Sequence, residues 1–119
     1  MNYIYLASPY TSPDLLVQRR RASQAAQSAA ILMQMGETVY SPIVHGHTVA
    51  MSDPELSERS HRFWMQQCYP LLHHAYAMYV LQLDGWQDSK GVQLEIDYAR
   101  QHGKPIYASR DGWKWSVMP

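Results

Sequence analysis

The sequence contains a single cysteine, Cys68, which excludes an internal disulfide and fits a reducing compartment. It begins Met-Asn-Tyr-Ile-Tyr, without the basic and apolar regions of a secretory signal. Its longest apolar runs fall far short of the about 18 residues that a membrane-spanning helix needs. We therefore expect a soluble, cytoplasmic protein with no membrane partner.

An excess of charge of either sign is also missing, because 10 basic and 10 acidic residues cancel. Without a long basic run, binding to a nucleic-acid backbone is not expected. The one cluster is Arg19-Arg20-Arg21, and three consecutive helical residues spread over most of a helix circumference. This pattern is typical of solvated helix surface, with a phosphate clamp as the alternative.

The sequence also lacks a cluster of cysteines or carboxylates that would complete a metal site beside the histidines. His45-Gly46-His47 is the only histidine pair spaced to share an ion at a strand end. We interpret this segment as a loop, either part of a polar active site or plain surface. The sequence therefore predicts no metal and no other cofactor.

Strand and helix patterns alternate along the 119 residues, which is about the length of one domain, spanning 1–119. Three helical crossovers indicate a small parallel sheet with strand order 2-1-3-4, and thus an α/β fold. The aromatic tail 111–119 either covers the core or reaches a neighbouring subunit. The expected strands are 3–7, 37–44, 77–83 and 104–108, and the expected helices are 13–36, 53 to about 74 with Pro70 as a kink or break, and 89–103.

Glu95 stands out because it is a carboxylate on the buried stripe of the third helix. With Ser89 as N-cap, the stripe consists of Val92, Ile96 and Ala99, and Glu95 falls on the same face. Burying a carboxylate without partners costs several kcal/mol. Glu95 is therefore expected to line a cleft or to be paired, either functionally or as a structural pair with an arginine or the first-strand tyrosine.

Three segments converge at the carboxyl ends of the predicted strands, where open parallel sheets bind ligands. They are 5–12, 43–47 and 84–95. In the last segment, Ser89, Lys90 and Gly91 place backbone N–H groups at a helix N-terminus, which attracts an anion such as a phosphate. The alternatives are that Ser89 is an ordinary N-cap and that Asp84 and Asp88 are turn residues around Gly85.

These pieces together resemble the nucleoside 2-deoxyribosyltransferase superfamily, which includes the deoxynucleoside 5'-monophosphate N-glycosidases and small bacterial and phage proteins. The resemblance covers most of residues 3–108. The matching residues are Ile4-Tyr-Leu-Ala-Ser-Pro-Tyr10, Asp84-Gly-Trp86, Ser89-Lys-Gly91, Glu95, Ala99 and Gly103-Lys-Pro-Ile106.

The resemblance implies a flavodoxin-like, three-layer fold and assigns roles to several residues. Glu95 matches the nucleophile that attacks the anomeric carbon of a 2-deoxyribosyl group, and Tyr5 matches the strand-end tyrosine that helps to hold the sugar and to orient the nucleophile. Ser89, six residues before Glu95, matches a phosphate-contacting serine, and Ser8 falls in the corresponding first loop.

One position departs from the family pattern. An aspartate that assists the leaving base is replaced here by Gln67 or Cys68, neither of which is a general acid of the same kind. A second proton-bearing group must help the base to leave. Asp84, Asp88 and His45 are the candidates.

The sequence therefore predicts cleavage or transfer at the N-glycosidic bond of a 2'-deoxynucleoside or its 5'-monophosphate, with a small-molecule substrate. The alternative is a non-catalytic nucleotide-binding or sensing module of the same fold, which the missing aspartate favours. The surplus of aromatic side chains further predicts a homodimer or larger homo-oligomer. This interface is expected to include the second helix, through Phe63, Trp64, Met65 and Tyr69.

Overall fold

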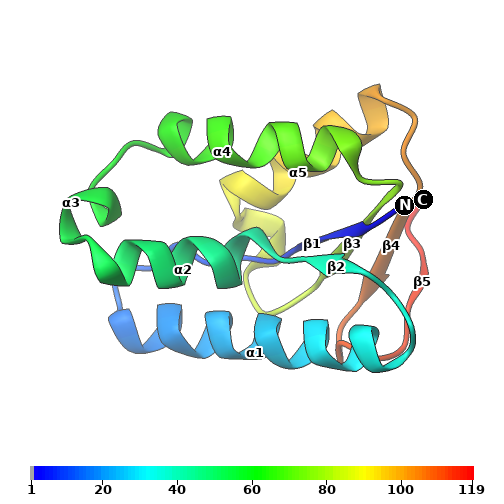
Figure 1. Ribbon diagram of the computed structural model, residues 1–119, viewed down its shortest axis with the longest axis horizontal. Helices are drawn as coiled ribbons and strands as arrows, with labels where there is room; N and C mark the ends of the chain where they lie inside the picture. The colour runs from blue at the N-terminus through cyan, green and yellow to red at the C-terminus, as the bar shows by residue number, and fades with distance from the viewer. Residues whose placement is uncertain (1) are drawn as a thin grey trace.

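The computed structural model describes residues 2–119 as a sheet flanked by helices on both faces (Figure 1). The strands are β1 (Ile4–Ala7), β2 (Val39–Tyr40), β3 (Ala77–Leu81), β4 (Ile106–Ser109) and β5 (Ser116–Val117). The helices are α1 (Leu15–Gln34), α2 (Pro42–Ser52), α3 (Pro54–Ser57), α4 (His61–His74) and α5 (Lys90–Gln101), with a 3-10 turn η1 (Trp86–Asp88) before α5.

The sheet has the order β2-β1-β3-β4-β5. Strands β1 to β4 pair in parallel, and β5 adds an antiparallel edge beside β4. The predicted α/β class and the order 2-1-3-4 are confirmed. Strand β5 was not predicted. Its two residues lie in the short tail, for which the sequence allowed two roles, covering the core or reaching a neighbouring subunit.

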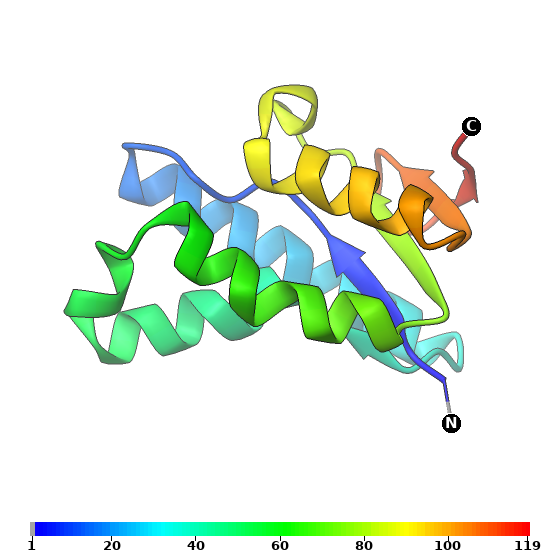
Figure 2. The ribbon, with the colours of Figure 1, turned by 90° about the horizontal axis from the view of Figure 1, so that it is seen from above.

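Alternating side chains of the strands divide the core between the two faces of the sheet. On one face, Ile4 and Leu6 pack with Leu32 of α1. On the other face, Tyr5 packs with Leu72 of α4 and Ile96 of α5. Figure 2 shows α4 and α5 on one side of the strands and α1 on the other, which gives the predicted three layers.

Residues 42–52 form helix α2, so the predicted strand 37–44 and the predicted loop His45-Gly46-His47 are both wrong. Only Val39–Tyr40 pair as β2. Ser41 accepts a hydrogen bond from the Val44 N–H as N-cap, and Pro42 takes the first helical turn, where its fixed φ suits a helix. The Ser-Pro pair therefore begins a helix and does not close a strand.

The predicted helix from residue 53 is divided into α3 and α4. Ser60 caps α4 by accepting from the Phe63 N–H. Pro70 was expected to kink or break the helix; it lies inside α4, which continues to His74, so a break does not occur. Met65 is buried and its aromatic neighbours on α4 are half-buried, so this helix exposes less aromatic surface than the sequence suggested.

The tail after β4 folds back onto the protein. Trp115 packs on Tyr79, with ring centroids 4.8 Å apart, and the Ser28 hydroxyl donates to the Gly112 carbonyl. Of its two predicted roles, the tail therefore performs the first and covers the core. Within residues 2–119, no helix combines the length and the apolar character needed to cross a membrane.

Candidate active site

The hydroxyl of Tyr5 on β1 donates a hydrogen bond to Oε2 of Glu95 on α5. Both side chains are buried, with 0% of Tyr5 and 5% of Glu95 exposed. The predicted stripe brings Glu95 there, because Val92, Ile96 and Ala99 are all buried on the same face of α5. The expected contact between Tyr5 and Glu95 is therefore present, and Tyr5 is one of the two pairing partners that the sequence allowed.

Burial changes the acidity of both groups. It raises the pKa of Glu95 from 4.5 to about 7, against the lowering effect of the hydrogen bond from Tyr5. The pKa of Tyr5 is raised well above 10.0, first by burial and then by the neighbouring Glu95 charge. Tyr5 therefore remains a donor, and Glu95 changes between acid and carboxylate near neutral pH.

Cys68 on α4 is the third member of this cluster. It packs against the buried cluster that contains Tyr5. Burial and then the Glu95 charge raise the pKa of Cys68 to about 11, against a lowering effect of Tyr5. Gln67 is exposed. The sequence allowed either Gln67 or Cys68 to replace the family's aspartate, and of these two it is Cys68 that faces the Tyr5–Glu95 pair. The Cys68 thiol stays protonated at neutral pH.

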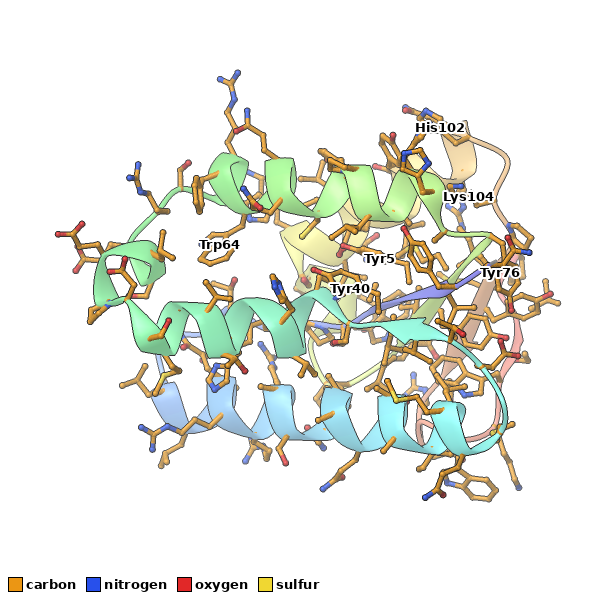
Figure 3. All side chains as sticks on the ribbon, viewed as in Figure 1. Tyr5, Tyr40, Trp64, Tyr76, His102 and Lys104 are labelled. Carbon is orange, nitrogen blue, oxygen red and sulfur yellow. The ribbon has the colours of Figure 1, made fainter. Side chains whose placement is uncertain are left out.

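Helix α2 supplies a wall that the sequence did not predict. The ring of Tyr40, at the end of β2, lies 6.0 Å from the Tyr5 ring, and its hydroxyl is 3.4 Å from Nδ1 of the exposed His45. His47 contacts Tyr10, with 2.7 Å between Nδ1 and the tyrosine hydroxyl. Figure 3 shows Tyr5 and Tyr40 close together between α2 and α4.

Trp64 of α4 also lies in the space between α4 and α2 (Figure 3). A Cβ built on Gly46 would lie 3.6 Å from the Trp64 ring, so the glycine and the indole are close neighbours. Both helices extend past the carboxyl ends of the parallel strands (Figure 1). Tyr40 and Trp64 therefore lie near the edge of the sheet where parallel α/β folds bind ligands.

Ser89 performs its expected role as N-cap of α5, accepting from the Val92 N–H at 3.3 Å. Beside it, Gly91 faces His61 at the start of α4, since a Cβ on Gly91 would lie 3.4 Å from His61 Cε1. The Nε2 atom of His61 is buried and has no partner within residues 2–119. Burial and then Lys90 lower the pKa of His61.

Ser8 follows β1 and is 2% exposed. Its hydroxyl has no hydrogen-bond partner among the described residues. Buried polar groups are nearly always satisfied, by protein, by water or by a ligand. The unpaired hydroxyl is therefore a group that a ligand at this edge of the sheet can satisfy.

Asp84 and Asp88 are exposed and form no hydrogen bond with Tyr5 or Glu95 among the described residues. Asp84 lies at a separate cavity on the α1 side of the sheet. Asp88 ends η1, directly before Ser89. The structure thus brings together Tyr5, Glu95 and Cys68, whereas Asp84 lies at the other cavity.

Metal ligation finds no support in the described part of the chain, where no group of three or more His, Cys, Asp or Glu side chains could hold an ion. His45 and His47 each contact a different tyrosine, Tyr40 and Tyr10.

Sequence reasoning missed Tyr40, His61 and Trp64 as neighbours of the site. The signals that place them are the Ser41-Pro42 helix start, which puts Tyr40 beside α2, and the Ser60 cap, which puts His61 first in α4.

Comparison with known proteins finds a family and a similar solved structure. The family model described as "Domain of unknown function (DUF1937)" matches residues 2–110. Among solved structures, the chain is similar to a 2-deoxyribosyltransferase from the psychrotolerant bacterium Bacillus psychrosaccharolyticus. The two are 26% identical with a TM-score of 0.60, over 89% of this chain and 70% of the other. A search of curated proteins finds no match. The resemblance to the nucleoside 2-deoxyribosyltransferase superfamily is confirmed.

Proposed function

The chain belongs to the family described as a domain of unknown function, DUF1937, and we propose that it transfers the deoxyribosyl group of a nucleoside. At the finer level, the proposed reaction cleaves or exchanges the N-glycosidic bond of a 2'-deoxynucleoside or its 5'-monophosphate. The similar 2-deoxyribosyltransferase supports the reaction class. The observation that carries the assignment is the buried hydrogen bond from Tyr5 to Glu95 at the carboxyl edge of the sheet.

In the proposed mechanism, ionised Glu95 attacks the anomeric carbon while the bond from that carbon to the base nitrogen breaks. The electron pair of the broken bond stays on the base, which takes up a proton. Positive charge develops on the sugar in the transition state, and the carboxylate beneath it stabilises that charge. Tyr5 holds Glu95 in place through its hydroxyl. Water or a second base then attacks the glycosyl ester and frees Glu95, giving hydrolysis or transfer.

The departing base needs a proton from a nearby acid. The thiol of Cys68, with a pKa of about 11, is a poor acid at neutral pH. Asp88 and His45 remain the proposed donors, because Asp84 lines a cavity on the other face of the sheet. Single variants Asp88→Asn and His45→Gln identify the donor as the one whose loss slows the release of poor leaving bases most.

The start of α5 is the proposed site of the 5' group. Ser89 and the backbone N–H groups of Lys90 and Gly91 lie at the positive end of the helix dipole, which favours a phosphate. The unpaired hydroxyl of Ser8 and the unpaired Nε2 of His61 are further polar groups for this substrate. Ser89→Ala should weaken the use of monophosphates and leave unphosphorylated nucleosides nearly unaffected.

The test incubates the protein with a panel of deoxynucleosides and their 5'-monophosphates and measures free base by chromatography. We expect base release by the wild type and a loss of several orders of magnitude in Glu95→Gln, which removes the charge but keeps the size. An exposed carboxylate two residues along the same helix provides the matched control Asp97→Asn, which should remain active. An active Glu95→Gln variant would exclude Glu95 as nucleophile.

The rival function is nucleotide binding without catalysis, and the thiol at position 68 favours it. Calorimetry with the same panel separates the two functions. Saturable binding of a nucleotide by a wild type that releases no base from any member of the panel would replace the enzymatic proposal with the sensing one.

A further inference from the structure

A second cavity lies on the opposite face of the sheet from Glu95. It has a volume of about 300 Å³ and is formed by α1 together with the segments that follow β3 and β4. Glu95 packs on the face covered by α4 and α5, whereas this cavity adjoins α1. The polar residues that line it are Arg20, Arg21, Gln24, Gln82, Asp84 and Arg110.

Only two of the three consecutive arginines of α1 line this cavity. Arg20 and Arg21 line it, whereas Arg19 is exposed and is not among its lining residues. Arg110 joins them from the other end of the chain, just after β4. Three arginines thus line the cavity together with one acidic residue, Asp84, so its lining has an excess of positive charge.

Arg21 is held in place before any ligand arrives. Its Nη1 donates to the Thr11 carbonyl and its Nη2 to the Asp84 carbonyl, each at 3.0 Å. Both partners are neutral carbonyl groups, so these bonds fix the guanidinium without neutralising its charge. Gly85 makes room for it, because a Cβ there would lie 2.9 Å from Arg21 Nη2.

Arg20 and Arg110 are exposed, and their guanidinium groups donate no hydrogen bond to any residue in 2–119. Their guanidinium groups present several N–H donors each, and the amides of Gln24 and Gln82 add more. Gathering like charges is unfavourable unless an anion offsets it, and guanidinium groups match the oxygens of a phosphate through paired hydrogen bonds. The cavity therefore has the charge, the donors and one fixed anchor that a phosphate needs.

We propose that this cavity binds the phosphate group of a small ligand, at a site separate from the Glu95 pocket. The proposal does not depend on the glycosidic reaction, since the cavity adjoins α1 on the face of the sheet opposite to the Tyr5 cluster. A bound phosphate would rest against Gln82, Leu83 and Asp84, the segment that leads through η1 to the start of α5. The site is thus connected by a short piece of chain to the helix that carries Glu95.

The first experiment titrates nitrogen-15-labelled protein with inorganic phosphate at low ionic strength and follows backbone amide signals by NMR. We expect saturable shifts at residues 82–85 and 110. Raising the salt concentration should weaken the response, because exposed charges are screened. An equal response to chloride at the same ionic strength would show screening alone and would overturn the proposal.

Variants locate the charge that binds. Arg20→Gln combined with Arg110→Gln should weaken phosphate binding at least tenfold, whereas Arg19→Gln removes the same charge outside the cavity and should change it less than twofold. Asp84→Asn should tighten it. If the double variant does not fold, Arg110→Gln alone, in an exposed segment after β4, replaces it in the binding measurement and should also weaken phosphate binding. Equal weakening by Arg19→Gln and Arg110→Gln would overturn the proposal.

The source of the phosphate is found by comparing three probes: inorganic phosphate, a deoxynucleoside 5'-monophosphate and the unphosphorylated deoxynucleoside. All titrations are repeated in Glu95→Gln, so that the probes are not consumed by catalysis during the measurement. Shifts at residues 82–85 with either phosphate-bearing probe, and none with the nucleoside, support the proposal. Shifts confined to residues 89–91 would assign phosphate to the α5 start and reject this second site.

Discussion

Replacing Glu95 by glutamine should make the stability of the protein less dependent on pH. In the folded chain the pKa of Glu95 is raised from 4.5 to about 7 by burial. Above pH 4.5 an unfolded chain releases this proton more readily than the folded one, so ionisation favours unfolding until pH passes 7. The free energy of unfolding therefore falls as pH rises through this window, and glutamine removes that loss.

The size of the effect follows from the two pKa values. At about 1.36 kcal/mol for each pKa unit, the full loss is about 3 kcal/mol, of which about 2.5 kcal/mol falls between pH 5 and pH 8. Glutamine keeps an oxygen for the Tyr5 hydroxyl but buries an amide, which can cost about 1–3 kcal/mol at every pH. The difference in slope between the two proteins, and not the absolute stability, therefore isolates Glu95.

Urea unfolding followed by the fluorescence of the four tryptophans measures this difference. The Glu95→Gln variant should gain on the wild type by about 2.5 kcal/mol from pH 5 to pH 8, while the exposed Asp97→Asn control keeps the wild-type slope. Wild-type and Glu95→Gln curves that stay parallel over this range would refute the claim that Glu95 is held in a desolvated site.

Further predictions concern the same residues and their surroundings. Tyr5→Phe removes the bond that lowers the pKa of Glu95, so carbon-13 NMR of the Glu95 carboxyl should show a titration midpoint above that of the wild type; an unchanged midpoint would contradict the pairing. Gly85→Ala should destabilise the fold by about 1–2 kcal/mol, because φ is 89° there and a Cβ meets Arg21; unchanged urea unfolding would count against this strain. Sedimentation at micromolar concentration should find a homodimer or larger assembly involving Phe63 and Tyr69, and a clean monomer would exclude it.

The parts of the site that the sequence predicted depend on local pattern. Glu95 could be placed because Val92, Ile96 and Ala99 mark one face of a helix, and helical geometry fixes where its neighbours point. Tyr5 could be placed beside it because adjacent parallel strands end at the same edge of the sheet.

The parts that failed depend on choices that local pattern does not make. Ser41-Pro42 suits the end of a strand as well as the start of a helix, and only the packing of α2 beside α1 and β1 settles it. The choice between Gln67 and Cys68 requires the rotation of α4 about its axis, which is set by Met65 and Leu72 entering the core. His61 meets Gly91 only after two helices distant in sequence have docked.

The hydrogen bond between Tyr5 and Glu95 joins residues 90 positions apart in the chain, and this has a consequence for synthesis on the ribosome. Domains begin to fold as they emerge, from the N-terminus onward. Strand β1 leaves first, yet its edge toward β3 stays unpaired until Ala77–Leu81 has followed. Glu95 arrives later still, on α5. A nascent chain therefore holds no assembled Tyr5–Glu95 pair until its last long helix is free, and any mutation that delays α5 acts on this buried pair and on the fold together.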